Sequence, residues 1–278
     1  MSDIESSPER SVATGGDGID LAPSFALAVA LIALPLIVVG CIFFAIIPGP
    51  WWIGIPLGLL IAAGLVWLKL RSAATGVLSK LGGGLLQADG SVRLENLVRG
   101  LSLAGGVEEP EILVLSDPAR NAMAVRSPTG GDARNHLVVT QGLLQSLEVV
   151  ELEGVVAELL TRLKNGDAES ATVAAALFGQ PILDGPLSAM LRPIASIGLG
   201  RLLSDDRDLE ADRQAVSLTR YPPGLFGALR TMSQGDVAPK SYTEGLAHLW
   251  LIDPTHTTAG QLAPRTPLDL RIDVLAEL

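Results

Sequence analysis

The most prominent pattern in the sequence is a long run of uncharged, mostly apolar residues near the N-terminus. It covers residues 21–68, between Asp20 and Lys69. One membrane-spanning helix needs about 20 apolar residues, so the run is long enough for two. Proline fixes φ and lacks an amide donor, so Pro-Gly-Pro at 48–50 predicts a turn. We therefore expect a transmembrane hairpin within residues 21–70, with helices at about 25–47 and 51–68.

Basic residues flank only one side of this predicted hairpin. The turn contains none, whereas Lys69, Arg71 and Lys80 follow the second helix. Because Lys and Arg accumulate on the cytoplasmic side, the pattern predicts a multi-pass protein of the plasma or inner membrane, with its N-terminus and main domain in the cytoplasm. Residues 1–20 are polar and acidic, which predicts a disordered tail. The alternative is a cleaved signal peptide before a buried helix, but the run is too long for a signal sequence.

Residues 73–278 show shorter apolar patterns, which predict one cytoplasmic domain. Residues 92–104 carry apolar side chains at helical spacing, and the pattern after Gly142 is helical almost to the end. Three runs have the length and β-branched content of strands: 112–115, 121–126 and 136–140. A chain of this length can bury a substantial core. The expected fold class is α+β, mostly helical with a small β-sheet.

A further uncharged stretch covers residues 170–183 and is followed by a mostly apolar segment that Arg192 interrupts. Fourteen residues are too few for a membrane span, which needs about 20. We expect buried or interface-lying helices over residues 170–203, and further membrane spans are the alternative.

Composition strengthens the membrane interpretation and excludes several classes of protein. The mean hydropathy is +0.41, and the net charge of −10 argues against nucleic acid as a partner, since phosphate binding needs clustered Lys and Arg. The single cysteine, Cys41, excludes a disulfide framework and a Cys-based zinc site. Only three histidines are available for a metal centre: His136, His248 and His256.

Residues 151–165 predict an amphipathic helix, which Gly166 ends. Its apolar stripe, at the spacing of one helical face, consists of Leu152, Val155, Val156, Leu159, Leu160 and Leu163. Beside the stripe lie Glu151, Glu158, Arg162 and Asn165. Polar side chains so close to a buried stripe mark this helix as the place to look for a site.

This helix resembles the active-site helix of the HtpX-like family of membrane zinc endopeptidases. Residues 151–167 read ELEGVVAELLTRLKNGD, and the family pattern is ELEAVLAHELAHxKNxD with the HExxH motif at its centre. Residues 121–124 (NAMA) resemble the family's NAFA strand, and 208–213 (DLEADR) resemble its EFEADR motif. The similarity runs from about residue 93 to 278. It implies a gluzincin-type metallopeptidase fold behind a membrane hairpin.

The resemblance also implies a metal site whose residues have changed. In the family, the two histidines of HExxH and a later carboxylate hold zinc, and the Glu of the motif is the general base. Here the histidine positions are Glu158 and Arg162, and the base position is Leu159. Asp208 stands at the third-ligand position, where the family has Glu, and Asp212 keeps the last acidic residue of that motif.

The changes remove the chemistry that the family uses. A guanidinium has only donors and stays protonated, so Arg162 cannot ligate a metal. Because HExxH is replaced by Glu158-Leu159-Leu160-Thr161-Arg162, we predict no catalytic residues, no metal and no cofactor. The alternative is an atypical zinc site rescued by a displaced histidine, but no histidine lies within a helical turn of Glu158. The histidines are otherwise expected to be surface or hydrogen-bonded residues.

Two interpretations of Arg162 remain open. Glu158 precedes it by four residues, which suits an exposed helical ion pair. The alternative places Arg162 in the vacated cavity, where its charge balances Glu158, Asp208 and Asp212 in place of Zn²⁺, because unpaired buried carboxylates are costly. The two interpretations differ in whether the pair is exposed or buried.

Peptide binding does not depend on a metal. In the family, the NAFA strand is an edge along which substrate lies extended, and such edge pairing uses the backbone. The candidate peptide-binding edge consists of Asn121, Ala122, Met123, Ala124 and Val125. An ordinary sheet edge is the alternative.

The sequence thus favours a membrane-anchored pseudo-peptidase. Its partners would be the lipid bilayer and a membrane protein or peptide, and it would act as a protein-binding regulator or an accessory subunit of a membrane protein assembly. One alternative is an active zinc endopeptidase with an atypical site that acts on membrane proteins. Another is a structural membrane subunit without a peptide groove.

Overall fold

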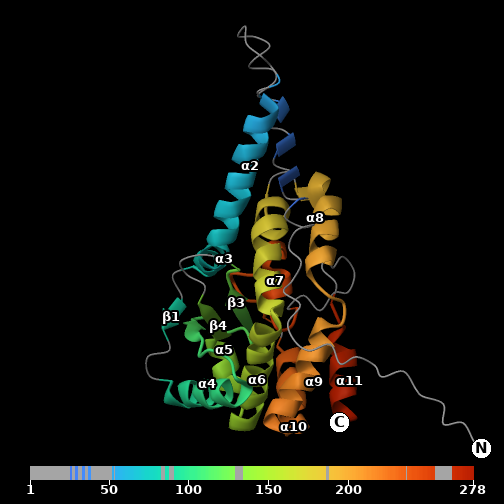
Figure 1. The fold of residues 1–278 in the computed structure, drawn as a ribbon. Coiled ribbons are helices and arrows are strands. Elements are labelled where there is room, and N and C mark those ends of the chain that lie inside the picture. The colour runs from blue at the N-terminus through green and yellow to red at the C-terminus, as the bar shows by residue number, and fades with distance from the viewer. Residues whose placement is uncertain are drawn as a thin grey trace, which may run out of the picture.

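A computed structural model describes residues 54–82, 85–87, 91–128, 134–185, 188–235, 237–253 and 265–278, with a few positions between 26 and 52. Helices pack around a small sheet, and α2 projects from one end (Figure 1). The strands are β1 (Leu85–Gln87), β2 (Glu111–Leu115), β3 (Ala122–Arg126) and β4 (Asn135–Thr140). The helices before α6 are α2 (Gly54–Arg71), α3 (Ala73–Leu81), α4 (Val92–Gly105) and α5 (Gln141–Ser146).

The second half of the chain is helical. Its α-helices are α6 (Val149–Asn165), α7 (Asp167–Ala174), α8 (Ser188–Leu202), α9 (Arg207–Thr219), α10 (Pro222–Ser233) and α11 (Leu268–Ala276). A π-helix, η2 (Ala175–Leu183), continues α7, and a 3₁₀ helix, η3 (Glu244–Leu249), precedes the last part of the chain. The expected α+β class, mostly helical with a small sheet, is confirmed.

The sheet has the strand order β1-β2-β4-β3, so β3 is an edge strand. β2 and β4 are parallel, with Ile112 opposite Leu137, and the other two pairings are antiparallel. The three predicted strands correspond to β2, β3 and β4. β1 was not predicted from the sequence, because three residues are too few to show a periodic pattern.

Helix α6 contacts both the sheet and the C-terminal helices. It lies between β3 on one side and α9 and α10 on the other (Figure 1), and its predicted apolar stripe belongs to the main hydrophobic core. Its N-terminus is tied by Glu151, whose carboxylate accepts from the backbone of Glu148 at 2.9 Å. Gly166, at φ +82°, ends the helix in the left-handed conformation that glycine adopts freely. The predicted helix and its end are therefore confirmed.

One close approach fixes the packing of α10 against α6. A Cβ on Gly154 would lie 2.6 Å from the backbone nitrogen of Leu225, so α10 sits directly against the α6 backbone.

Helices α7 and η2 cover the uncharged stretch that was expected to form buried or interface-lying helices. Ala174, Ala175 and Phe178 are fully buried there. This part of the region is therefore buried inside the protein.

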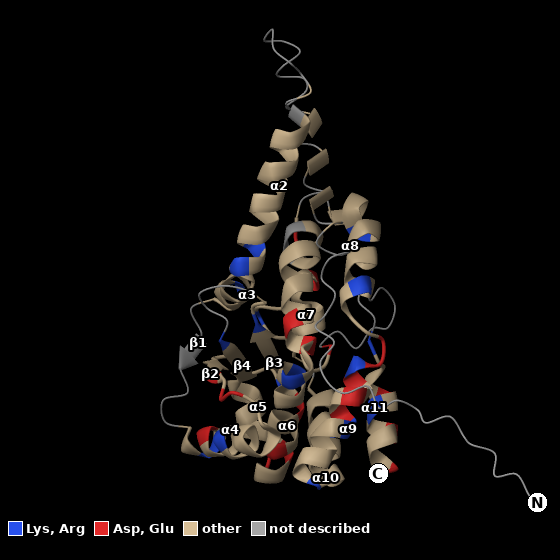
Figure 2. Ribbon diagram, in the orientation of Figure 1, with Lys and Arg blue, Asp and Glu red and all other residues tan. Residues whose placement is uncertain are grey.

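The predicted membrane segment is described only in part. The predicted tail 1–20 and most of the first predicted helix, 25–47, lie outside the described residues. The second predicted helix corresponds to α2, which carries no charge before Lys69 and Arg71 at its end (Figure 2). In the part of the chain that the structure describes, no single helix has the length and apolarity to cross a membrane; residues 55–81 of α2 and α3 reach them together, with a bend of 59°.

Candidate functional site

Helices α6, α9 and α11 bring five charged side chains together in the interior. Glu158 and Arg162 come from α6, Asp208 and Asp212 from α9, and Arg271 from α11. Every one of the five is buried, with at most 6% of its surface exposed. The α6 residues lie one helical turn apart on the face that packs against α9, which explains why residues far apart in sequence meet here.

Arg162 bridges the two carboxylates that face it. Its Nε and Nη2 donate to Oε1 of Glu158 at 2.8 and 2.6 Å, and Nη2 also donates to Oδ1 of Asp208 at 2.8 Å. The pair of Glu158 and Arg162 is therefore buried, and the interpretation as a solvated surface pair is wrong. The contacts expected for a guanidinium inside the cavity are present for Glu158 and Asp208.

Asp212 is held by a different arginine. Nε and Nη2 of Arg271 donate to its two carboxylate oxygens at 2.8 and 2.7 Å, in a bidentate pair. Arg271 Nη2 also lies 3.2 Å from Oε1 of Glu158, and Nη1 donates to the carbonyl of Leu251 at 3.0 Å. Arg271, and not Arg162, thus balances the third carboxylate of the cluster.

Two further arginines complete the cluster around Asp208. Arg265 Nε lies 3.7 Å from Oδ2 and Arg207 Nε lies 3.9 Å from Oδ1, while the backbone N–H of Thr266 donates to Oδ2 at 3.3 Å. Four guanidinium groups therefore surround three carboxylates. We call these seven side chains the arginine cluster: Glu158, Arg162, Arg207, Asp208, Asp212, Arg265 and Arg271.

The cluster fixes the charge of Asp208 in particular. Burial by itself raises the pKa of a carboxylic acid. Around Asp208 the guanidinium groups of Arg162 and Arg265 outweigh that effect and hold its pKa well below the usual range. Burial dominates at Glu158 and raises its pKa, although Arg162 and Arg271 oppose the rise. Asp208 is accordingly the firmly ionised carboxylate of the cluster.

A divalent metal does not fit this arrangement. The position that a metal would share between Glu158 and Asp208 is crossed by the guanidinium of Arg162, a permanent cation without lone pairs to donate. Within the described ranges, no three His, Cys, Asp or Glu side chains are grouped so that they could hold a metal ion. Leu159, at the general-base position, is fully buried in the apolar core.

His136 and His248 have partners other than Glu158 and Arg162. His136 on β4 has its Nδ1 3.6 Å from Glu111. His248 on η3 is buried, and its Nε2 lies 2.9 Å from the carbonyl oxygen of Ala171. Because a carbonyl only accepts, Nε2 carries the proton. His256 lies outside the described residues.

Acid is expected to destabilise the protein through His248. Burial, aided by the charge of Arg207, lowers its pKa to about 3 from the usual 6.5. Between these values the unfolded chain binds a proton that the folded chain does not, so stability is lost as pH falls, by about 2 kcal/mol at pH 5. The measurement is chemical unfolding of the detergent-solubilised protein between pH 7.5 and 5.

The control for this prediction is His248→Gln, which keeps an amide donor for Ala171 but does not titrate. Its loss of stability over the same pH range should be smaller by about 2 kcal/mol. Asp208 does not interfere, because a depressed carboxyl pKa costs stability mainly below about pH 4. Glu158, whose raised pKa acts in the opposite direction, is the same in both proteins. An identical pH slope in both proteins would contradict the prediction.

The predicted peptide-binding edge is described in full. Asn121 lies just before β3, and Ala122, Met123, Ala124 and Val125 form the strand; all are buried. On the side away from β4, Met123 pairs with Trp250 of the same chain. The edge exists where it was expected, and part of it is covered by the chain itself.

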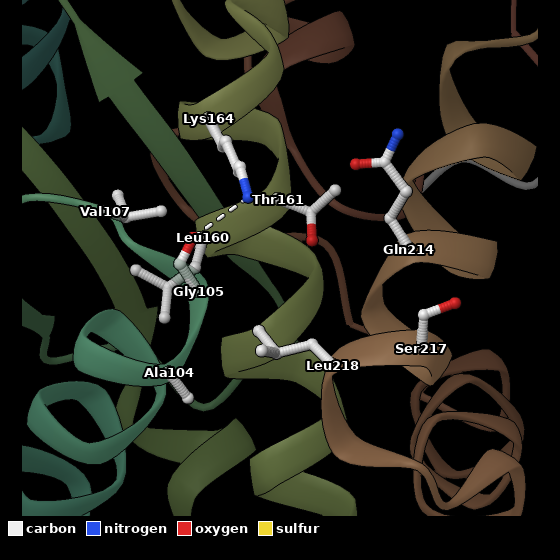
Figure 3. Close-up of a pocket in the computed structure, with 9 residues that line it drawn as sticks. All are labelled: Ala104, Gly105, Val107, Leu160, Thr161, Lys164, Gln214, Ser217 and Leu218. Carbon is white, nitrogen blue, oxygen red and sulfur yellow. Dashed lines mark hydrogen bonds between the residues drawn. The ribbon is translucent and has the colours of Figure 1, made fainter.

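A separate pocket of about 270 Å³ opens on a different face of α6, between α4 and α9 (Figure 3). Lys164 extends across its upper side and donates to the carbonyl of Gly105 at 3.0 Å. Leu160 and Leu218 form apolar walls. Neither Glu158 nor Arg162 lines this pocket, so it is not part of the candidate site.

Arg207, Arg265 and Arg271 were not predicted from the sequence as members of the cluster. One signal was available: three acidic residues at positions expected to be buried cannot be balanced by Arg162 alone. That count predicts further cations but does not identify them. Arg271 is 113 positions from Glu158 in the sequence, so no local pattern connects the two.

Comparison with known proteins finds similar curated sequences and a similar solved structure. No protein-family model matches the sequence. Three similar curated proteins are each named protease HtpX homolog. The one from Dictyoglomus thermophilum is 35% identical over 58% of this chain and 60% of its own length. Those from Dictyoglomus turgidum and Tropheryma whipplei (strain Twist) are 33% and 29% identical, over 60% and 70% of this chain and 62% and 75% of their own lengths.

These relatives are proteases by name. The chain is thus similar in sequence to proteins of that name, in keeping with the resemblance at residues 151–167, and it spans about three fifths of the length of the two Dictyoglomus relatives. Among solved structures it is similar to Ste24p of S. mikatae, with a TM-score of 0.42 and 14% identity, over 91% of this chain and 64% of that one.

Proposed function

We propose that this protein is a membrane-anchored HtpX-like pseudo-peptidase, in which a buried arginine cluster replaces the metal of a gluzincin-type site. It acts by binding protein and not by hydrolysis. One observation carries the proposal: the guanidinium of Arg162 donates to both Glu158 and Asp208, at 2.6 and 2.8 Å through a single nitrogen. A side chain in that place blocks the position that a shared metal ion would need.

Two functions that hydrolysis needs are missing together: metal ligation and proton transfer from water. Arg162 cannot ligate a metal, and Leu159 cannot accept a proton from water. A general base alone typically contributes about 10²–10⁴ in rate. A single compensating group elsewhere therefore does not restore hydrolysis.

Exposed apolar residues support the membrane anchor. Leu60 on α2 is 72% exposed and Leu68 is 55% exposed, and the guanidinium of Arg71 lies over the ring of Trp67 at the end of the same helix. A basic and aromatic end is typical of a helix that meets the lipid headgroups. We propose that α2 is the second helix of the hairpin, with both the N-terminus and the domain in the cytoplasm.

In this role the protein is a regulator or accessory subunit of a membrane protein assembly. The second candidate is an active zinc endopeptidase with an atypical site, and what favours it is that the similar proteins are named proteases. Under that candidate, Glu158 and Asp208 would be the ligands that remain.

Metal analysis of the full chain, purified in detergent, separates the two candidates. We expect no stoichiometric zinc after dialysis against zinc-containing buffer, and no casein digestion that a chelator suppresses, since Arg162 occupies the position of a ligand. The variants Glu158→Ala and Asp208→Ala test the site, and Asp269→Ala, an exposed acid on α11, is the control. One zinc per chain that disappears only in the first two variants, accompanied by chelator-sensitive digestion, establishes the active enzyme.

A further inference from the structure

A short segment that follows η3 lies along the free edge of β3. Residues 250–252, which we call the strap, run antiparallel to the strand, with Trp250 opposite Met123. The backbone N–H of Leu251 donates to the carbonyl of Ala122 at 2.8 Å. The strap is itself buried: Trp250 and Leu251 are 0% exposed and Ile252 is 4% exposed.

Asn121 fastens the strap at the start of β3. Its Nδ2 donates to the carbonyl of Ile252 at 2.8 Å, and its Oδ1 accepts from the N–H of Ile252 at 3.3 Å. The side-chain amide of Asn121 therefore makes the two hydrogen bonds to Ile252 that the backbone of a neighbouring strand would make. The strap thus uses the part of the edge that was predicted to hold a peptide.

The arginine cluster holds the strap from the other side. Arg265 donates to the carbonyls of Trp250 and Leu251, and Arg271 donates to the same carbonyl of Leu251. These two arginines also pair with Asp208 and Asp212. Two of the arginines that balance the buried carboxylates therefore also hold the strap.

The rest of the β3 edge is also in use. Near its far end, the N–H of Arg126 donates to Oγ1 of Thr172 on α7 at 3.1 Å. An extended peptide cannot donate to the carbonyl of Ala122 while the strap is in place, because that carbonyl already accepts from the N–H of Leu251. The strap stands where such a peptide would lie.

We propose that the strap is an autoinhibitory contact: an internal strand that occupies the peptide edge of β3 and is locked there by Arg265 and Arg271. The inference rests on the proposed function in that it names an extended peptide as the ligand that the strap excludes. A partner segment binds only when the strap leaves, and weakening the arginine cluster favours that release.

The contacts of the strap suit a releasable element. β3 and β4 pair over five consecutive residues, from Ala122 to Arg126, whereas the strap makes a single bridge with β3. Most of its other hydrogen bonds come from side chains of Asn121, Arg265 and Arg271. Burial of Trp250 keeps the closed state dominant, so the open state is a minor one that local opening reaches before the sheet unfolds.

Hydrogen exchange of the full chain in detergent tests the closed and open states without any substitution. In the wild-type protein we expect the Leu251 amide to exchange at least about tenfold faster than the β4 amides that pair with β3, because local opening precedes global unfolding. If the strap and β4 exchange at the same rate, the strap is a permanent strand of the sheet and the inference is overturned.

The variant Arg265→Ala tests the lock. Loss of its bonds to the strap carbonyls should raise exchange at Leu251 by about tenfold or more. The matched control is Arg192→Ala, which breaks a bidentate ion pair with Glu244 on η3 and touches no strap atom. Equal exchange in Arg265→Ala and wild type, or an equal rise in the control, contradicts the lock.

The exchange experiment tests the strap and the zinc analysis tests the proposed function, so one can be contradicted without the other. Fast exchange of the strap in a protein that proves to be an active zinc peptidase leaves the inference standing and removes the proposed function. Slow exchange in a zinc-free, inactive protein does the reverse.

Discussion

Replacing Arg162 by alanine is expected to lower the melting temperature by about 10 °C. The substitution removes the central cation of the cluster and leaves Glu158 with only the 3.2 Å contact to Arg271. Asp208 keeps the longer contacts with Arg265 and Arg207. Breaking a buried ion pair from one side costs about 3–5 kcal/mol, and each kcal/mol corresponds to about 2–4 °C in a domain of this size.

The measurement is thermal unfolding of the detergent-solubilised protein, followed by intrinsic fluorescence. Arg213→Ala is the matched control, because Arg213 lies on α9, is exposed and makes a loose ion pair with Glu210 at 3.9 Å. Such surface pairs contribute about 0–1 kcal/mol. A melting temperature unchanged in Arg162→Ala would mean that the cluster does not stabilise the fold and would remove the support for the proposed replacement of the metal.

The local parts of the fold could be predicted from the sequence. Helix α6 combines a continuous apolar stripe with a glycine stop, and β2 and β4 are short β-branched runs between turn residues. Each of these signals lies within about 17 residues of chain, so the pattern specifies the element without tertiary information. β1 lacks such a signal, since Leu85–Gln87 is a strand only because it pairs with β2.

Only the site residues that lie within a family motif could be predicted from the sequence. The resemblance placed Glu158, Arg162, Asp208 and Asp212 together, and they lie together. Whether Glu158 and Arg162 are buried was left open, because a position beside an apolar stripe faces solvent unless another helix covers it. Here α9 and α11 provide that cover. The covering residue Arg271 and the strap are far from α6 in sequence, so no period or spacing indicates either of them.

The double substitution of Arg271 and Asp212 is expected to be far less damaging than Arg271→Ala alone. Arg271 is 1% exposed and forms the bidentate pair with Asp212. Arg271→Ala leaves the carboxylate of Asp212 buried without its bidentate partner, which costs about 3–5 kcal/mol. When Asp212→Asn is added, the uncompensated charge disappears, and a coupling energy of about 2 kcal/mol or more is expected between the two positions.

Urea unfolding of the wild type, the two single variants and the double variant gives this coupling energy. Arg271→Lys adds a second check, because an ammonium keeps the charge but cannot form two parallel bonds with one carboxylate, so it should fall between the wild type and Arg271→Ala. Additive losses would mean that the two side chains contribute separately, as packing groups on α11 and α9. Strong coupling would instead mean that charge balance sets the stability of this interior: each carboxylate is tolerated because a particular guanidinium faces it.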